Sequence, residues 1–337
     1  MSGIAAIGVR REAPIDPQLL TAMARILAAR GPDRGGQWSG DRIALVHTLF
    51  RTVDESADEA QPLTFDEQVW ITADARIDAR EELVRELRAH GREASLREPD
   101  VHLILHAYHV WGKGCVEHLL GDFAFVIADT RTQRLFAARD HLGVKPLFYA
   151  NVPDGIVVSN MLDCVRLHPQ VTNTLNDSYI CDFLLFGWNT DVAASAFADI
   201  HRLPPAHWLE WTPEGMRIER YWTLTIPAIV RRRRQRDYIE AFMEVFQQAI
   251  ADRLRTDKVV ISLSGGIDSA SIAATMMPLL ARRSPPTAVQ AVTAVYDRLI
   301  PDEERYYAGL VAQQLGIPIE FVAGDDLECF GPDWDTA

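Results

Sequence analysis

The stretch VVISLSGGIDS, residues 259–269, contains the strongest structural signal in this chain of 337 residues. Residues 259–263 are mostly apolar and rich in β-branched side chains, which is typical of a buried parallel strand. Gly265 and Gly266 then allow the backbone to turn sharply and to approach a ligand closely. Because a helix is predicted from Ser269 onward, we expect this segment to form a strand, a tight loop and a helix.

The polar groups of this loop favour phosphate binding. Amides at a helix N-terminus attract anions, and the hydroxyls of Ser264 and Ser269 add hydrogen-bond donors. Asp268 would repel phosphates unless a metal ion bridged the two, so we expect it to bind Mg²⁺. A Walker A loop requires a lysine that this loop lacks. The alternative interpretation is a tight turn in which the aspartate only caps the helix.

Helices and strands alternate around the loop. They are predicted at residues 238–255, 259–263, 269–280, 288–295, 303–315 and 319–322. Such alternation indicates a parallel sheet with helices on both faces. This part, residues 237–337, is predicted to be one domain. An arginine-rich run in residues 231–236 favours a solvated linker at residues 221–236.

Residues 1–220 are predicted to be a second domain, rich in strands. Residues 30–36 are expected to form a loop because they contain Gly31, Pro32, Gly35 and Gly36. Strands are predicted at residues 4–9, 43–47, 69–73, 123–129, 134–138, 156–159, 207–211 and 217–222. Helices are predicted at residues 17–29, 78–89 and 100–111, with Asp16 as the first N-cap and Asp78 in a capping box with Glu81.

Composition excludes several classes of protein. The net charge of −13 argues against a dedicated binder of nucleic acid or of acidic membranes. No apolar stretch is long enough to span a bilayer, and the first residues lack a signal-peptide pattern. The four cysteines are scattered, which predicts neither a metal cage nor a disulfide framework. A cytoplasmic location is the expected default.

Several motifs together resemble the asparagine synthetase family from end to end. They are SGGIDS at 264–269, RGPD at 30–33, QPL at 61–63, GDFAF at 121–125 and ARDHLGVKPL at 138–147. The resemblance implies an α+β N-terminal-nucleophile domain, an αββα sandwich, followed by an α/β Rossmann-like ATP-pyrophosphatase domain that is incomplete here. It also implies ATP and Mg²⁺ as cofactors. The phosphates would contact Ser264, Gly265, Gly266 and Ser269, Mg²⁺ would contact Asp268, and the adenine pocket would include Leu263 and Val295.

The glutaminase signatures of that family are largely replaced. Ser2 occupies the position of the N-terminal cysteine nucleophile, and Leu49 that of the arginine that holds the glutamine carboxylate. Asp74, in the Ala-Asp-Ala run at 73–75, replaces oxyanion donors with a charge that would repel an oxyanion. Asp100 keeps its counterpart, and is interpreted here as a helix-start carboxylate. We therefore expect an inactive glutaminase fold.

A lost glutaminase beside a retained synthetase loop resembles the β-lactam synthetases and the lasso peptide macrolactam cyclases. Residues 70–78 and 332–335 are most similar to the cyclase branch. The resemblance thus predicts an AMP-forming amide ligase acting on a carboxylate and an amine, a precursor peptide being one candidate substrate. An asparagine synthase using ammonia or glutamine, and a non-catalytic nucleotide-binding or structural subunit, stay open as alternatives.

The resemblance carries expectations about assembly as well. The synthetase domain of the family continues beyond residue 337, so we expect a C-terminally truncated chain or a partner that completes it. A sheet with few strands should then leave apolar surface exposed. A homo-oligomer is an open expectation, whereas neither nucleic acid nor a membrane is expected as a partner.

Overall fold

The computed structural model describes residues 1–11, 14–226, 229–284 and 286–325 of the chain. The chain forms two compact units, of which the first ends at Ile226 and the second comprises the remainder. This division lies within the predicted linker at residues 221–236. Each unit has hydrophobic clusters of its own.

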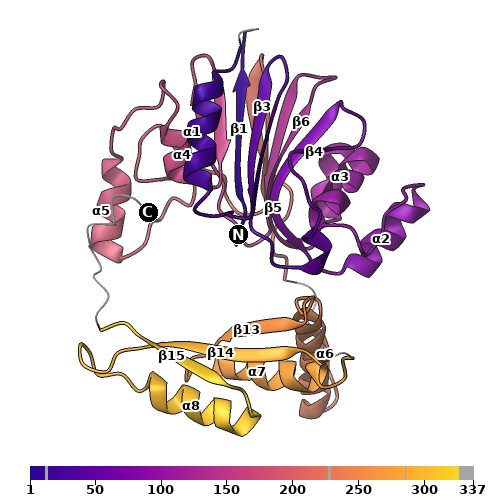
Figure 1. The fold of residues 1–337 in the computed structure, drawn as a ribbon, viewed down its shortest axis with the longest axis vertical. Coiled ribbons are helices and arrows are strands. Elements are labelled where there is room, and N and C mark those ends of the chain that lie inside the picture. The colour runs from indigo at the N-terminus through magenta and orange to yellow at the C-terminus, as the bar shows by residue number, and fades with distance from the viewer. Residues whose placement is uncertain (12–13, 227–228, 285, 326–337) are drawn as a thin grey trace. The chain divides into compact units, whose positions relative to one another are not determined.

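The first unit contains two antiparallel sheets of six strands each (Figure 1). The order in one sheet is β10 (His201–Arg202), β8 (Phe148–Val152), β9 (Gly155–Ser159), β1 (Gly3–Val9), β3 (Ile43–Leu49) and β2 (Arg34–Ser39). The order in the other is β12 (Gly215–Arg220), β11 (His207–Thr212), β7 (Arg134–Arg139), β6 (Gly121–Asp129), β5 (Val69–Ile77) and β4 (Leu63–Thr64).

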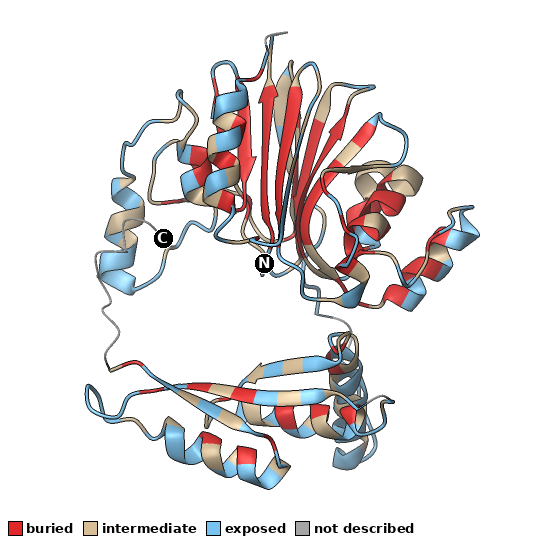
Figure 2. Cartoon of the chain, in the orientation of Figure 1, coloured by how far each residue is buried: buried red, intermediate tan, exposed pale blue. Residues whose placement is uncertain are grey.

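The two sheets pack face to face, and helices cover their outer faces. Alternate residues of β1 show this: Ile4 packs against the second sheet, whereas Ile7 packs against helices. The first outer face carries α1 (Pro17–Leu27) and α4 (Leu162–Arg166), and the second carries α2 (Arg80–Ala89) and α3 (Asp100–Trp111). Figure 2 shows strands such as β1, β3 and β6 as mostly buried. The layers are therefore helix, sheet, sheet and helix, as the predicted αββα sandwich requires.

Local sequence signals account for much of this unit. The Asp16 side chain accepts a hydrogen bond from the Gln18 amide at 2.8 Å, and Pro17 begins α1, as predicted. Helix α3 has the predicted bounds. Sequence analysis missed β8, α4 and helix α5 (Asp177–Phe186). Helix α5 has no buried residue. Short 3₁₀ segments lie at Asp54–Ser56 and Gly112–Glu117.

Two local predictions were wrong. Residues 34–36 are part of strand β2, because pairing with β3 overrides the turn preference of the two glycines. A Cβ atom at Gly36 would lie 2.0 Å from the Gln61 carbonyl oxygen, so the glycine permits a close approach of two backbones. Asp78 forms no capping box, since α2 begins at Arg80 after Ala79, which has a left-handed φ of 49°.

The second unit is a parallel α/β structure over its described residues. Its sheet has the order β13 (Lys258–Ser262), β14 (Ala288–Val295) and β15 (Ile319–Ala323). Its helices are α6 (Gln235–Ala251), α7 (Ile267–Leu280) and α8 (Glu304–Leu315). The parallel sheet was predicted correctly. A complete Rossmann-like strand order stays a prediction.

The helices of this unit lie on one face of the sheet. Ile261, Val289 and Phe321 pack against them, whereas Val260 and Val322 on the other face are 67% and 44% exposed. The prediction of helices on both faces is therefore wrong for the described residues. The strands lie in the sheet in the same order as in the sequence, β13, β14 and β15. Right-handed crossovers between them therefore place consecutive helices on the same face of the sheet. The expected exposed apolar surface is confirmed.

Among the described residues, no helix has both the length and the apolar character needed to cross a membrane.

We predict that Leu45→Ala destabilises the first unit by about 2–5 kcal/mol, because Leu45 is fully buried between the two sheets. Denaturant unfolding followed by tryptophan fluorescence measures this, since every tryptophan except Trp334 lies in that unit. Leu184→Ala, at a side chain that is 76% exposed, is the matched control and should change stability by less than about 0.5 kcal/mol. Equal effects of the two substitutions would contradict the sandwich core.

Candidate functional site

The predicted phosphate loop lies between strand β13 and helix α7. Gly266 is the N-cap with extended backbone angles, and Ile267 is the first helical residue. The helix therefore begins two residues before the predicted start at Ser269. Asp268 consequently lies in the first turn of α7, next to the loop.

The two serines of the loop are hydrogen-bonded to each other. The Oγ atoms of Ser264 and Ser269 are 2.9 Å apart, and the Ser264 amide donates to the Ser269 hydroxyl at 3.0 Å. The Gly266 amide donates to the Ser264 hydroxyl at 3.2 Å. The structure thus brings together the residues that the sequence assigned to phosphate binding and gives the loop a closed shape.

Glu304 is a residue of this loop's surroundings that sequence analysis missed. Its Oε2 atom accepts a hydrogen bond from the Gly265 amide at 2.6 Å, across 39 residues of sequence. The Glu304 carboxylate therefore accepts a hydrogen bond from the amide that was predicted to contact phosphate. The acidic run at residues 302–304 follows the neighbouring strand β14, and the carboxyl ends of parallel strands meet at one edge. This acidic run was the sequence feature that could have identified Glu304.

Leu263 and Val295, predicted for the adenine pocket, have fully buried side chains. Leu263 packs in the helix-facing cluster, and the Val295 carbonyl accepts a hydrogen bond from the Gly324 amide at 2.8 Å. Their role stays a prediction.

Asp268 has the chemistry that the predicted Mg²⁺ ion needs. The residue is exposed, and in the described part of the chain its carboxylate has no hydrogen-bond or ion-pair partner. No group of three or more His, Cys, Asp or Glu side chains among the described residues is arranged to hold a metal. Since Mg²⁺ often binds one or two carboxylates together with substrate phosphates, a single free carboxylate beside the loop fits that mode.

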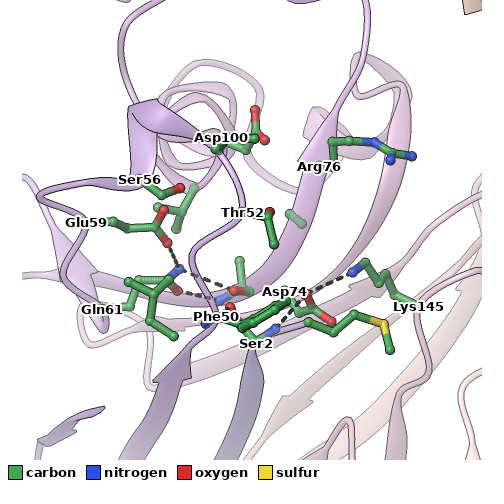
Figure 3. A pocket seen from close by; sticks show the side chains of 16 residues that line it. Ser2, Phe50, Thr52, Ser56, Glu59, Gln61, Asp74, Arg76, Asp100 and Lys145 are labelled. Atoms are coloured by element: carbon green, nitrogen blue, oxygen red, sulfur yellow. Dashed lines mark hydrogen bonds and ion pairs between the residues drawn. The ribbon is translucent and has the colours of Figure 1, made fainter. Parts of the chain in front are cut away.

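A pocket of about 150 Å³ in the first unit contains the residues expected at the glutaminase site (Figure 3). Its lining includes Ser2 just before β1, Leu49 of β3, Asp74 of β5, Asp100 of α3 and Lys145 of the loop that follows β7. Five segments that are far apart in the sequence therefore meet in one cavity. Lys145 was not identified as a site residue from sequence.

The Asp74 carboxylate lies directly beside Ser2. Its Oδ1 atom accepts from the Ser2 amide at 3.2 Å and from the Lys145 ammonium at 2.9 Å (Figure 3). The Arg30 guanidinium lies 3.5 Å from Oδ2. Asp74 is only 3% exposed, so these partners stabilise a buried negative charge. That charge would repel an oxyanion forming near Ser2, whereas an acyl-transfer site needs preorganised donors there.

The Ser2 hydroxyl is also part of the local hydrogen bonding, because it accepts from the Phe50 amide at 3.1 Å. Burial lowers the pKa of the nearby Met1 amino group, against the opposing influence of Asp74. Burial also lowers the pKa of His47, on the neighbouring strand β3, to about 3, so this imidazole is neutral at physiological pH. Among the described residues, no side-chain base is hydrogen-bonded to the Ser2 hydroxyl.

Asp100 has a structural partner. It is the first residue of α3 and forms a buried ion pair with Arg80 of α2. Arg80 also donates to the carbonyl oxygens of Leu96 at 2.8 Å and Glu98 at 2.6 Å. This arrangement agrees with the interpretation of Asp100 as a helix-start carboxylate, although the residue still borders the pocket.

Comparison with known protein families matches residues 1–222 to the glutamine amidotransferase domain and residues 241–330 to asparagine synthase. Among curated proteins, the chain is 30% identical over 262 residues to asparagine synthetase [glutamine-hydrolyzing] 3 of Bacillus subtilis, covering 77% of this chain and 42% of that protein. It is 28% identical over 325 residues to amidase chry2 of Gibberella zeae, covering 89% and 46%.

Among solved structures, the chain is similar to the glutamine phosphoribosylpyrophosphate amidotransferase from B. subtilis complexed with ADP and GMP. The identity is 18% and the TM-score 0.45, with 95% of this chain and 65% of that chain covered. The present chain spans less than half the length of the two curated relatives. From the two family matches and these relatives, the chain belongs to the asparagine synthetase family, with a class II glutamine amidotransferase domain followed by an asparagine synthase domain.

Proposed function

We propose that the protein is an ATP-dependent, AMP-forming amide ligase whose amidotransferase unit does not hydrolyse glutamine. One contrast between the two units supports this proposal. The pocket around Ser2 contains the Asp74 carboxylate where an oxyanion would need donors, whereas the loop from Ser264 to Ser269 keeps its glycines and both hydroxyls. The membership of the family supports ligase chemistry in the second unit.

The proposed reaction has two steps. A substrate carboxylate attacks the α-phosphorus of ATP, the bond from that phosphorus to the bridging oxygen breaks, and pyrophosphate leaves. An amine then attacks the acyl carbon, loses a proton, and forms the amide as AMP leaves. Ser264, Gly265, Gly266 and Ser269 would bind the phosphates at the N-terminus of α7, which favours a departing anion. Asp268 would hold Mg²⁺, which neutralises phosphate charge.

The amine would come from the substrate itself, because a pocket that cannot hydrolyse glutamine supplies no ammonia. Carboxylate and amine within one molecule would give a lactam, and a precursor peptide carries both groups. Similarity of residues 70–78 to the macrolactam cyclase branch supports this class. The similarity of residues 332–335 lies outside the described residues. Asparagine synthesis from aspartate and ammonia is the second candidate, favoured by the 30% identity to a protein named asparagine synthetase.

The first prediction from the proposed function concerns glutamine. Purified protein should release glutamate from L-glutamine only at background rate, because Asp74 would repel the developing oxyanion. An enzyme-coupled glutamate assay measures the rate, with Ser2→Ala as the matched variant. Turnover in the unsubstituted protein that disappears in Ser2→Ala would show that the pocket is an active glutaminase.

A second prediction concerns magnesium. Asp268→Asn should weaken MgATP binding about tenfold and leave the fold intact, because the residue is exposed and would lose only its charge toward the ion. Calorimetric titration measures the affinity. Glu244→Gln, which removes a charge from an exposed position of α6, is the control and should bind as the unsubstituted protein does. Unchanged MgATP affinity in Asp268→Asn would show that Asp268 does not bind Mg²⁺ and serves only at the start of the helix.

A third prediction concerns the products. Protein expressed from its complete reading frame should convert ATP to AMP and pyrophosphate when given a peptide that contains both a carboxylate and an amine. The loop has no lysine to promote γ-phosphate transfer, so ADP is not expected. Chromatographic separation of nucleotides tests this. ADP would overturn the mechanism, whereas AMP that requires aspartate and ammonia would identify asparagine synthesis instead.

A further inference from the structure

The peptide group before Gly265 is fixed from outside the loop. Its N–H donates to Glu304 Oε2 at 2.6 Å, a short distance typical of a hydrogen bond to a charged acceptor. We infer that Glu304 is a positioning residue of the phosphate loop, which orients this peptide and, through it, the two serine hydroxyls. The inference rests on the proposed ATP-binding function.

Glu304 is itself held in place by neighbouring hydrogen bonds. The Asp302 carboxylate accepts from the Glu304 amide at 2.8 Å and from the Tyr296 amide at 2.7 Å. Tyr296 follows directly after strand β14, and Glu304 is the first residue of α8. A chain of hydrogen bonds therefore runs from the end of β14 through Asp302 and Glu304 to Gly265 after β13. The loop is thereby tied to a rigid part of the sheet.

Close packing fixes the same peptide from a second direction. A Cβ atom at position 265 would lie 2.3 Å from the Cβ atom of Tyr307, which is on the same side of α8 one turn after Glu304. Only a glycine lets the loop approach the helix this closely. The hydrogen bond and the packing contact therefore act on one residue, and both come from the first turn of α8.

The orientation of this peptide determines where the hydroxyls lie. Its carbonyl belongs to Ser264 and accepts a hydrogen bond from the Ser269 hydroxyl at 3.1 Å. The same Ser269 hydroxyl lies 2.9 Å from the Ser264 hydroxyl. A rotation of the peptide would move the carbonyl away from Ser269 and separate the two hydroxyls. Loss of the Glu304 contact should therefore disorganise the group that would meet the β- and γ-phosphates.

A carboxylate beside a phosphate site can also compete with the phosphates, and the two roles predict opposite results. A glutamine at position 304 is neutral, but its carbonyl oxygen can accept the same hydrogen bond. If Glu304 positions the loop, Glu304→Gln preserves binding and Glu304→Ala weakens it. If Glu304 competes with phosphate, both substitutions strengthen binding.

The test is calorimetric titration of the full 337-residue chain with MgATP, with magnesium pyrophosphate and with AMP. Glu304→Ala should bind MgATP and pyrophosphate about tenfold more weakly, which corresponds to the loss of one strong hydrogen bond. AMP should bind within about twofold of the unsubstituted chain, because it lacks the phosphates that the loop would hold. Glu304→Gln should restore MgATP binding to within about twofold.

Two further variants make the test specific. Glu303→Ala removes the same charge one residue earlier, from an exposed position whose side chain forms no cap, and should leave binding unchanged. Gly265→Ala leaves Glu304 intact but forces the loop away from α8, and should reproduce the selective loss of MgATP. If Glu304→Ala fails to fold, as judged by thermal melting, Glu304→Gln carries the test, because positioning predicts unchanged MgATP binding in that variant and competition predicts tighter binding.

The outcomes separate this inference from the proposed function. If the unsubstituted chain binds neither MgATP nor pyrophosphate, the proposed function fails and the inference with it. If the unsubstituted chain binds MgATP and Glu304→Ala binds it equally well or more tightly, only the positioning role is overturned. An equal loss of AMP and MgATP affinity would also overturn it, because that result indicates general damage to the unit.

Discussion

The buried Asp74 carboxylate is the interaction on which the first unit's pocket depends. It joins β5 to the backbone of Ser2, which directly precedes β1, to Lys145 and to Arg30, so segments from four parts of the sequence converge on one charge. A buried charge is tolerated only when it is paired, and removal of a partner is costly. The same ion pairs that stabilise the pocket therefore place negative charge beside the hydroxyl that would have to act as nucleophile.

Carboxylates also organise the loops of the second unit, with a different consequence. Glu304 accepts from the Gly265 amide, and Asp325 accepts from the amides of Asp297, Arg298 and Leu299 at 2.7–2.8 Å. These contacts lie at the carboxyl ends of parallel strands, where ligands of open α/β sheets bind. In this unit the carboxylates accept hydrogen bonds from loop amides, and Ser264 and Ser269 stay partly exposed. A buried carboxylate thus lies beside Ser2 in one unit, whereas in the other unit a carboxylate holds the loop proposed to bind phosphate.

Sequence predicted the features that depend on neighbouring residues. Apolar periodicity located α1, α3 and most strands, and the loop from Ser264 to Ser269 was predicted from its residue order between a strand and a helix. Features that depend on distant contacts were not predictable. Strand β2 exists because of its pairing with β3, and the partners Lys145–Asp74 and Glu304–Gly265 are 71 and 39 residues apart. Helices on both faces were predicted from alternation, but strand order decides the face, and alternation does not reveal strand order.

The Asp74 charge should prevent nucleophilic chemistry at position 2. The most direct measurement compares two variants, each with Met1 removed: Ser2→Cys alone, and Ser2→Cys combined with Asp74→Asn. Mass spectrometry would follow alkylation of the introduced thiol by an electrophilic glutamine analogue. A neighbouring carboxylate disfavours the thiolate, so labelling should be about tenfold or more faster in the double variant. Equal labelling rates in the two variants would show that the Asp74 charge does not limit nucleophilic chemistry at position 2.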